Sequence, residues 1–262
     1  MRSIAAACLS ALLIASTATA AVAGSPLPND DMAQATTITS LPFSATVDLS
    51  AATVEAGENT ECLFPSTKSV WYRYVVPARQ LIQIDPTGSD PDAGGRIYYE
   101  YSGYPPTLGN CVSMQYSGLK LMVGPVTTLW FQLTVDTGTT AALSITSLPL
   151  LTVSSTFDPT ATYNAKAGTI TATGTITCNL EASFGGVFVT LHQRQGRSVA
   201  VAQGSATSTC GPTPTRWTAT LYGTVNAGPA TADWSTQAAL FGPPDQFASA
   251  SDGPVTMSIK KR

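Results

Sequence analysis

The chain has 262 residues and a formal net charge of −3 at pH 7, and only 11% of its residues are charged. Nucleic-acid binding depends on basic surfaces that neutralise phosphates, so this slightly acidic balance argues against a nucleic-acid partner. The basic end, Lys260–Arg262, is too short to change that expectation.

The first 23 residues have the pattern of a secretory signal peptide. Arg2 gives a basic start, residues 4–14 are apolar or small, and small residues precede both Ala20 and Ala23. We expect cleavage after Ala23, with Ala20 as the alternative. The apolar run is shorter than the roughly 20 residues of a transmembrane anchor, and Cys8 precedes most of it, unlike a lipoprotein cysteine. The mature protein is therefore expected to be secreted and extracellular, with its oligomeric state left open.

The first half of the mature chain consists of short runs of β-branched and aromatic residues. Clusters of Gly, Pro, Asp and Ser separate these runs, as expected between strands. In the last run, Leu129, Phe131, Leu133 and Val135 alternate with Trp130, Gln132 and Thr134, which is the period of a half-buried strand. The runs are 70–76, 80–84, 96–101 and 127–135.

A second series of strand patterns follows Pro149. Residues 168–178 alternate Thr with apolar or small residues, and further runs cover 187–191, 199–201, 217–221, 230–240 and 254–260. These runs are six of the seven strands that we expect in residues 149–262, a number that fits an immunoglobulin-like sandwich. The predicted fold class is all-β: two β-sandwich domains in tandem, a jelly-roll-like sandwich at 24–148 followed by an immunoglobulin-like sandwich at 149–262.

Four of the five cysteines remain after the leader is removed. An even count in an exported protein indicates disulfides, although four cysteines allow three pairings. We favour Cys62–Cys111 and Cys178–Cys210, because each pair then stays within one expected domain. This assignment also removes free thiols from the candidate nucleophiles.

The first half resembles the bacterial pre-peptidase C-terminal domain group, a β-sandwich module of exported proteins related to collagen-binding modules. The resemblance spans residues 28–147 and implies a β-sandwich fold. One departure is Pro91, which stands where that group usually has a hydrophobic residue. The matching segments are Pro28–Asp31, Ala33–Ile38, Leu41–Pro42, Ser69–Tyr72 and Gly88–Asp92.

The second half resembles an uncharacterised immunoglobulin-like family of exported bacterial proteins. The segments that carry this resemblance are 157–160, 168–171, 174–178 and 191–197. It implies a fold and a location, and it lends no activity.

The inventory of reactive side chains argues against an enzyme. His192 is the single histidine, and strand alternation places it opposite the apolar face of Val187, Val189 and Leu191, so we interpret it as an exposed strand residue. No nucleophile elbow, zinc-protease motif or phosphate-binding loop occurs. A hydrolase built on a carboxylate pair stays open as an alternative.

Two loop regions concentrate hard oxygen ligands. Calcium takes six to eight such oxygens, and the related collagen-binding modules hold calcium near an N-terminal segment of this kind. Turn and capping chemistry explains the same residues and is the favoured interpretation, so no cofactor is required. The calcium candidates are Asp30, Asp31, Asp85, Asp90 and Asp92.

Aromatic residues cluster in residues 98–104 and 71–74. Alternation sends Tyr98 to the face opposite Tyr99, and flat rings with hydroxyl groups suit sugars or extended peptides. We therefore name Tyr98 and Tyr104 as candidate ligand-binding residues, and we expect Trp71 or Tyr72 in the core.

These observations predict a secreted, non-catalytic binding or adhesion protein. The expected partner is a polysaccharide or an extracellular protein. The alternatives are a structural spacer of the envelope and an exported hydrolase with an unrecognised carboxylate site.

Overall fold

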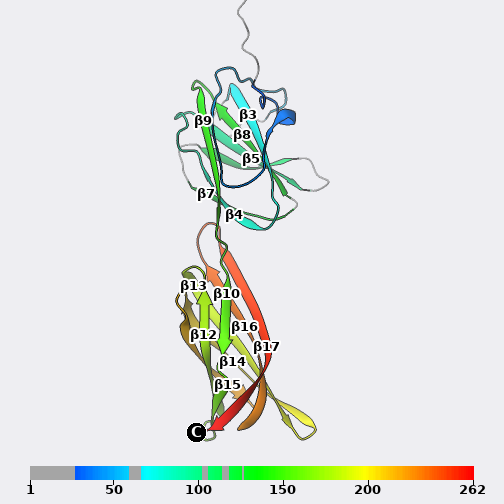
Figure 1. Cartoon of the computed structure of the whole chain (residues 1–262), viewed down its shortest axis with the longest axis vertical. Helices are drawn as coiled ribbons and strands as arrows, with labels where there is room; N and C mark the ends of the chain where they lie inside the picture. Colours follow the sequence, from blue (N-terminus) through cyan, green and yellow to red (C-terminus); the bar gives the residue numbers. More distant parts are fainter. Residues whose placement is uncertain (1–26, 59–65, 102–105, 114–117, 126) are drawn as a thin grey trace, which may run out of the picture.

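The fold is all-β, in two sandwiches joined by the segment between β9 and β10 (Figure 1). The computed structural model describes residues 27–58, 66–101, 106–113, 118–125 and 127–262. Residue 148, where the first expected domain ends, is the last residue of β9, and β10 begins at Val153. No helix among the described residues is long and apolar enough to span a membrane.

The first sandwich consists of a five-stranded and a four-stranded sheet. The five-stranded sheet has the order β1-β3-β8-β5-β6, with β1 parallel to β3, and the four-stranded sheet has the order β2-β9-β4-β7. Its elements are η1 (Met32–Gln34), β1 (Thr36–Ile38), β2 (Phe43–Asp48), β3 (Lys68–Val75), β4 (Gln80–Asp85), β5 (Gly94–Tyr101), β6 (Thr107–Ser113), β7 (Leu119–Val123), β8 (Thr127–Val135) and β9 (Thr140–Leu148).

One apolar core lies between these two sheets. Val70, Tyr72 and Phe131 reach it from the five-stranded sheet, and Ile82 and Leu143 reach it from the other. The alternation predicted for residues 127–135 is confirmed on its core side, where Leu129, Phe131, Leu133 and Val135 are all buried. The face of the five-stranded sheet opposite this core is called the outer face below.

The second sandwich is immunoglobulin-like. On one side β10 and β15 flank β12, and on the other the order is β11-β17-β16-β13-β14, with β11 parallel to β17. Short pairings of β11 with β12 and of β14 with β15 connect the two sides. Its elements are β10 (Val153–Phe157), β11 (Thr160–Asn164), β12 (Thr169–Cys178), β13 (Ala182–Gln195), β14 (Ser198–Cys210), β15 (Thr215–Gly223), β16 (Gly228–Leu240) and β17 (Gln246–Lys261).

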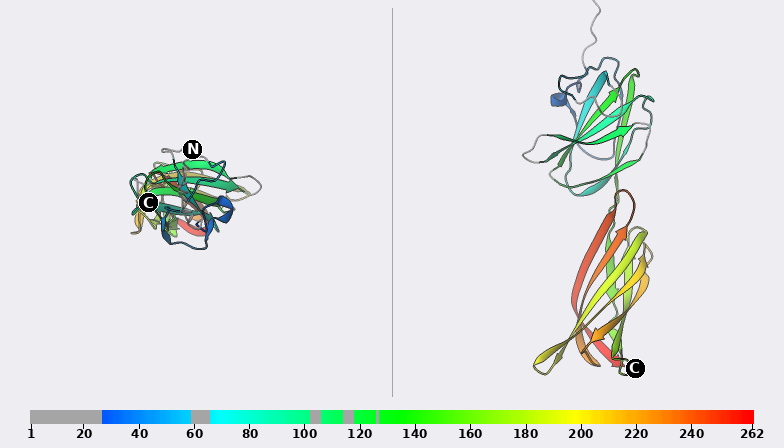
Figure 2. Two further views of the ribbon diagram at one scale, coloured as in Figure 1. Left: turned by 90° about the horizontal axis from the view of Figure 1, so that it is seen from above. Right: turned by 180° about the vertical axis from the view of Figure 1, so that it is seen from behind.

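A tryptophan on β15 organises the second core. The Trp217 side chain is 1% exposed, and its indole N–H donates to the carbonyl oxygens of Thr156 and Thr175. Gly174 lies opposite it in the ladder, and a Cβ there would stand 2.6 Å from the indole ring. The absent side chain of Gly174 therefore makes the space that the ring occupies. The long strands of this core run along the long axis of the molecule (Figure 2).

The predicted disulfide of the second sandwich is confirmed. Cys178 ends β12 and Cys210 ends β14, so the bridge connects the two sides of the sandwich. Both cysteines are 1% exposed. The other predicted pair is not tested, because Cys62 lies outside the described residues and the side chain of Cys111 is not described.

Candidate functional site

The outer face of the first sandwich carries a grid of polar and aromatic side chains. Alternation along β3, β8 and β5 turns every second residue away from the core. The ladder aligns Trp71, Gln132 and Arg96 in one row, and Arg73, Trp130 and Tyr98 in the next.

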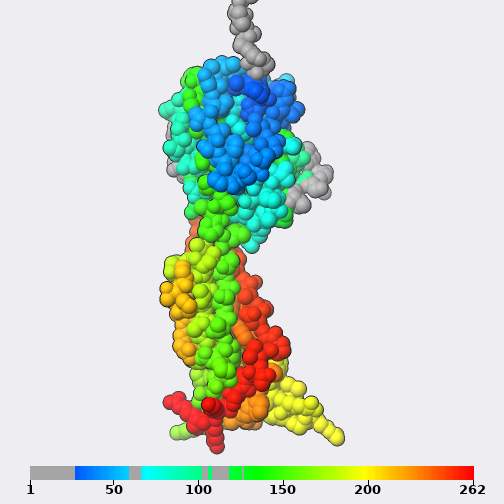
Figure 3. Space-filling view, in the orientation of Figure 1, coloured from blue at the N-terminus to red at the C-terminus, as the bar shows by residue number. Residues whose placement is uncertain are grey.

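A groove of about 580 Å³ lies over this grid. Residues of η1 and of the loop at 55–58 form part of its lining, and in Figure 3 the N-terminal segment, in blue, covers the front of the first sandwich. We call this feature the aromatic groove. The lining residues that matter below are Glu55, Glu58, Trp71, Tyr98, Glu100 and Trp130.

Three aromatic side chains line the groove: Trp71, Tyr98 and Trp130. Trp71 is 2% exposed and Tyr98 is 9% exposed, and their centroids lie 5.4 Å apart. Both therefore form the floor, while half-buried Trp130 offers the most accessible ring. Backbone and side-chain hydrogen bonds between Asn29 and Trp71 hold the N-terminal segment beside β3, so the groove has a fixed edge.

Glu58 is the hub of a hydrogen-bond network under the floor. Its carboxylate accepts from the Ser69 hydroxyl at 2.8 and 2.9 Å, from the Trp71 indole N–H at 2.9 Å and from the Gln132 amide at 2.6 Å. The oxygen of the Gln132 amide in turn accepts from the Tyr98 hydroxyl at 3.1 Å. Because Ser69 and Gln132 are fully buried, the network fixes the orientation of both floor rings.

Arg96 supplies a buried positive charge to this network. It is 1% exposed, and its Nε has no hydrogen-bond partner in the described part of the chain. Burial lowers the pKa of the guanidinium, and the charges of Tyr98 and Glu58 oppose that shift. Burial likewise raises the pKa of the Tyr98 hydroxyl, which therefore stays a neutral hydrogen-bond donor at neutral pH.

Glu100 and Arg73 lie on either side of Trp130. The indole N–H of Trp130 donates to a Glu100 carboxylate oxygen at 2.7 Å, which fixes the ring plane. The Arg73 guanidinium carbon lies 6.0 Å from the Trp130 ring centroid, and its Nε donates to the Thr37 hydroxyl. Trp130 thus has an anionic neighbour at its edge and a cationic neighbour over its ring.

The five candidate calcium ligands are divided among separate turns. Asp30 accepts from the backbone and hydroxyl of Thr53, Asp85 accepts from Thr87, and Asp31 precedes η1. No group of three or more metal-ligating side chains forms among the described residues. The calcium site therefore stays a prediction from sequence.

Asp90 and Asp92 do converge, on the turn between β8 and β9. Asp90 accepts from the backbone N–H groups of Thr139 and Thr140, and Asp92 accepts from those of Thr137 and Gly138. A Cβ at Gly138 would stand 2.4 Å from an Asp92 oxygen, so glycine is needed for both carboxylates to reach the turn.

Asp92→Asn is expected to lower the melting temperature at neutral pH and to reduce the acid sensitivity of the fold. The Gly138 N–H above all, with Thr137, holds the pKa of Asp92 below its usual 3.8. A lowered native pKa stabilises the fold above the unfolded pKa, and this contribution is lost as pH falls through the native value. The difference in melting temperature between the two proteins should therefore shrink as the pH falls below 3.8. A constant difference across that range would contradict the assignment.

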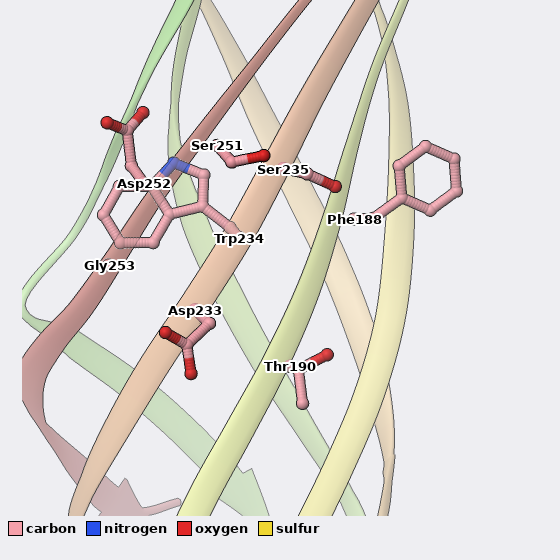
Figure 4. A pocket seen from close by; sticks show the side chains of 8 residues that line it. All are labelled: Phe188, Thr190, Asp233, Trp234, Ser235, Ser251, Asp252 and Gly253. Carbon is pink, nitrogen blue, oxygen red and sulfur yellow. The ribbon is translucent and has the colours of Figure 1, made fainter.

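A second depression, on β13, β16 and β17 of the immunoglobulin-like sandwich, is a weaker candidate. It has a volume of about 390 Å³, and its two aromatic residues, Phe188 and Trp234, lie apart (Figure 4). Phe188 points outward and is 46% exposed, whereas Trp234 is 8% exposed and packs on Phe157 in the core. The two rings therefore share no platform.

His192 lies near that depression, on the outer side of β13. Its Nε2 stands 3.5 Å from an Asp233 carboxylate oxygen, and its side chain is 40% exposed. The pair has no neighbouring nucleophile in the hydrogen bonds that the structure describes, so it gives no basis for a catalytic triad.

The structure places the predicted aromatic residues in different ways. Tyr98 lines the groove as a floor residue, and Tyr104 lies outside the described residues. Tyr72 is in the core as expected, while Trp71 is buried on the opposite, outer face. Sequence reasoning missed Trp130, Glu58 and Glu100 as site residues, although alternation had put Trp130 on the face away from Leu129.

Comparison with known proteins gives no family. No family model and no curated protein matches the chain. Among solved structures it is similar, at 10% identity, to a beta-glycosidase from Bacteroides vulgatus (TM-score 0.24), covering 78% of this chain and 27% of that one. It is also similar, at 10% identity, to an exo-chitosanase from Amycolatopsis orientalis (TM-score 0.22), covering 78% and 28%. The chain thus spans little more than a quarter of either protein, and TM-scores this low transfer no activity to it.

Proposed function

We propose that this is a secreted, non-catalytic binding protein whose aromatic groove holds a polysaccharide. The observation that carries the proposal is the meeting of Trp71, Tyr98 and Trp130 in one groove on a rigid sheet. The signal-peptide pattern of residues 1–23 and the Cys178–Cys210 disulfide support export, because disulfides persist in oxidising compartments.

Sugar rings match the chemistry of this groove. One face of a sugar ring carries C–H groups, which pack on an aromatic ring, while the hydroxyl groups around it need hydrogen-bond acceptors. Half-buried Trp130 offers the ring, and the Glu55 and Glu100 carboxylates offer acceptors at the rim. The floor is preorganised by the Glu58 network, which reduces the entropy lost on binding.

A hydrolase is the second candidate function, because Glu58 and Glu100 line the same groove and glycosidases use paired carboxylates. Binding is favoured since the described donors around Glu58 are structural: they hold Ser69, Trp71 and Gln132 in place. Shortening of a bound oligosaccharide during incubation, lost in Glu100→Gln, would favour hydrolysis.

Trp130→Ala is expected to weaken polysaccharide retention by about 30-fold or more, the scale of a central aromatic anchor. Trp130 is half-buried and outside the core, so the melting temperature should change little. Retention on a glycan array and affinity electrophoresis measure the loss.

Tyr222→Ala serves as the matched control, because Tyr222 is an aromatic residue 68% exposed on the second sandwich. It should leave retention unchanged. Retention that survives Trp130→Ala would overturn the site, and a protein that retains no glycan at all would favour the spacer alternative.

A further inference from the structure

The carboxylates of the aromatic groove have no ionic partner among the described residues. Glu55 accepts from the Met32 backbone N–H, Glu100 from the Trp130 indole, and Glu58 from three neutral donors. The ion pairs that the structure describes, His192–Asp233 and Arg216–Asp158, both lie in the other sandwich. Three carboxylates therefore line the groove, and the hydrogen bonds that they accept come from uncharged donors.

The nearby positive charges are placed away from the groove lining. Arg96 lies beneath the floor and is 1% exposed, and it offsets the charge of Glu58 from below. Arg73 stands over Trp130 beside β1 and does not line the groove. No basic side chain of the described chain lines it, so Glu55 and Glu100 at the rim have no cationic partner within the groove lining.

Aromatic rings and unpaired carboxylates together favour a cationic ligand. The face of an indole attracts an ammonium group through its quadrupole, and tryptophan is the best ring for this contact. Arg73 already makes such a contact with one part of Trp130. A carboxylate at the edge of the same ring, as with Glu100, adds a charge-assisted hydrogen bond.

We propose that the aromatic groove selects a polysaccharide with protonated amino groups, that is, an amino sugar without its N-acetyl groups. This inference rests on the proposed function, because it names the class of polysaccharide for the same groove. Neutral sugars would leave the two rim carboxylates without counter-charges, and acidic sugars would be repelled by them.

The test compares two hexasaccharides that differ mainly in charge. Isothermal titration calorimetry with the glucosamine hexamer and the N-acetylglucosamine hexamer, at a pH where the free amines are protonated, should show at least about tenfold tighter binding of the first. Added salt should narrow the difference, because it screens exposed charges.

Charge variants separate the electrostatic contribution from stacking. Glu100→Gln keeps an acceptor for the Trp130 indole and removes the charge, so it should weaken glucosamine-hexamer binding about fivefold. It should weaken acetylated-hexamer binding by a smaller factor, because the Gln amide oxygen still accepts from a sugar hydroxyl. Arg73→Gln removes the competing cation and should tighten glucosamine-hexamer binding. Glu181→Gln, the same change at an exposed position of the second sandwich, should alter neither.

Each remaining outcome decides between the two proposals. Equal affinity for the two hexamers contradicts the selection for amino groups but still supports polysaccharide binding in the aromatic groove. Hexalysine that binds as tightly as the glucosamine hexamer, with the same response to Glu100→Gln, overturns the sugar assignment in favour of a basic peptide. Failure to bind either hexamer, together with an empty glycan array, overturns the selection and the proposed function alike.

Discussion

Glu58→Ala is expected to lower the free energy of unfolding of the first sandwich by about 3 kcal/mol. The change removes the acceptor for three buried donors, on Ser69, Trp71 and Gln132, and each unsatisfied buried donor costs about 1–3 kcal/mol unless water replaces the partner. It also leaves the buried Arg96 guanidinium without the charge that opposes its desolvation. Urea denaturation followed by tryptophan fluorescence measures the loss, since Trp71 and Trp130 both report on this region.

The matched control for this prediction is Glu55→Ala. Glu55 lines the same groove, but its side chain is exposed and accepts one backbone hydrogen bond, from Met32. Its removal should change stability by no more than about 0.5 kcal/mol. If Glu58→Ala behaves like Glu55→Ala, the network under the groove floor is not a stabilising feature. The groove would then be shaped by core packing alone.

The strands that the sequence predicts well are those with one apolar face. Residues 127–135 and 168–178 alternate clearly, and both are strands in the structure, β8 and β12. The alternation works because a sandwich buries every second residue of each central strand. The same alternation predicts the all-β fold class. It also places Cys178 on the core side of its strand, where a bridge to Cys210 can form.

The last strand was predicted too short, because the sequence in its middle resembles a turn. The expected last strand, 254–260, is the end of β17, which begins at Gln246. Its middle is exposed, and Asp252-Gly253-Pro254 looks like a turn. In the structure Gly253 has a φ of +114° beside an irregularity in the β16–β17 ladder. The chain therefore stays in β17 through these three residues, although their sequence is typical of a turn, and the ladder accommodates them with a bulge.

The site was less predictable than the fold because it depends on long-range contacts. Glu58 lies in a segment without regular structure, and its partners Ser69, Trp71 and Gln132 are 11, 13 and 74 residues away in sequence. Nothing local marks such a residue as a hub. Trp130 could have been named, because alternation already separated it from the core. The placement of Trp71 and Tyr98 in the floor depends on long-range partners: Trp71 bonds Asn29 and Glu58, and Tyr98 bonds Gln132.

Cys178→Ala/Cys210→Ala is expected to cost the second sandwich up to about 4 kcal/mol of unfolding free energy. The bridge closes a segment with a sequence separation of 32, and the chain-entropy model gives roughly that value for such a loop. It also joins the ends of β12 and β14, on the two sides of the sandwich, where the Cys178 N–H donates to the Gly211 carbonyl at 2.9 Å. The covalent link therefore reinforces a backbone contact between the two sides.

Guanidinium denaturation of the double variant measures this cost, and Thr207→Ala/Thr209→Ala is its control. Both threonines are exposed on β14, the strand that carries Cys210, so their removal should change stability by about 0.5 kcal/mol or less each. Two transitions are expected in the double variant, because the two cores are separate and only the second is weakened. A single unshifted transition would mean that the Trp217 core holds the sandwich closed without the bridge. The disulfide would then contribute little to the free energy of unfolding of the second sandwich.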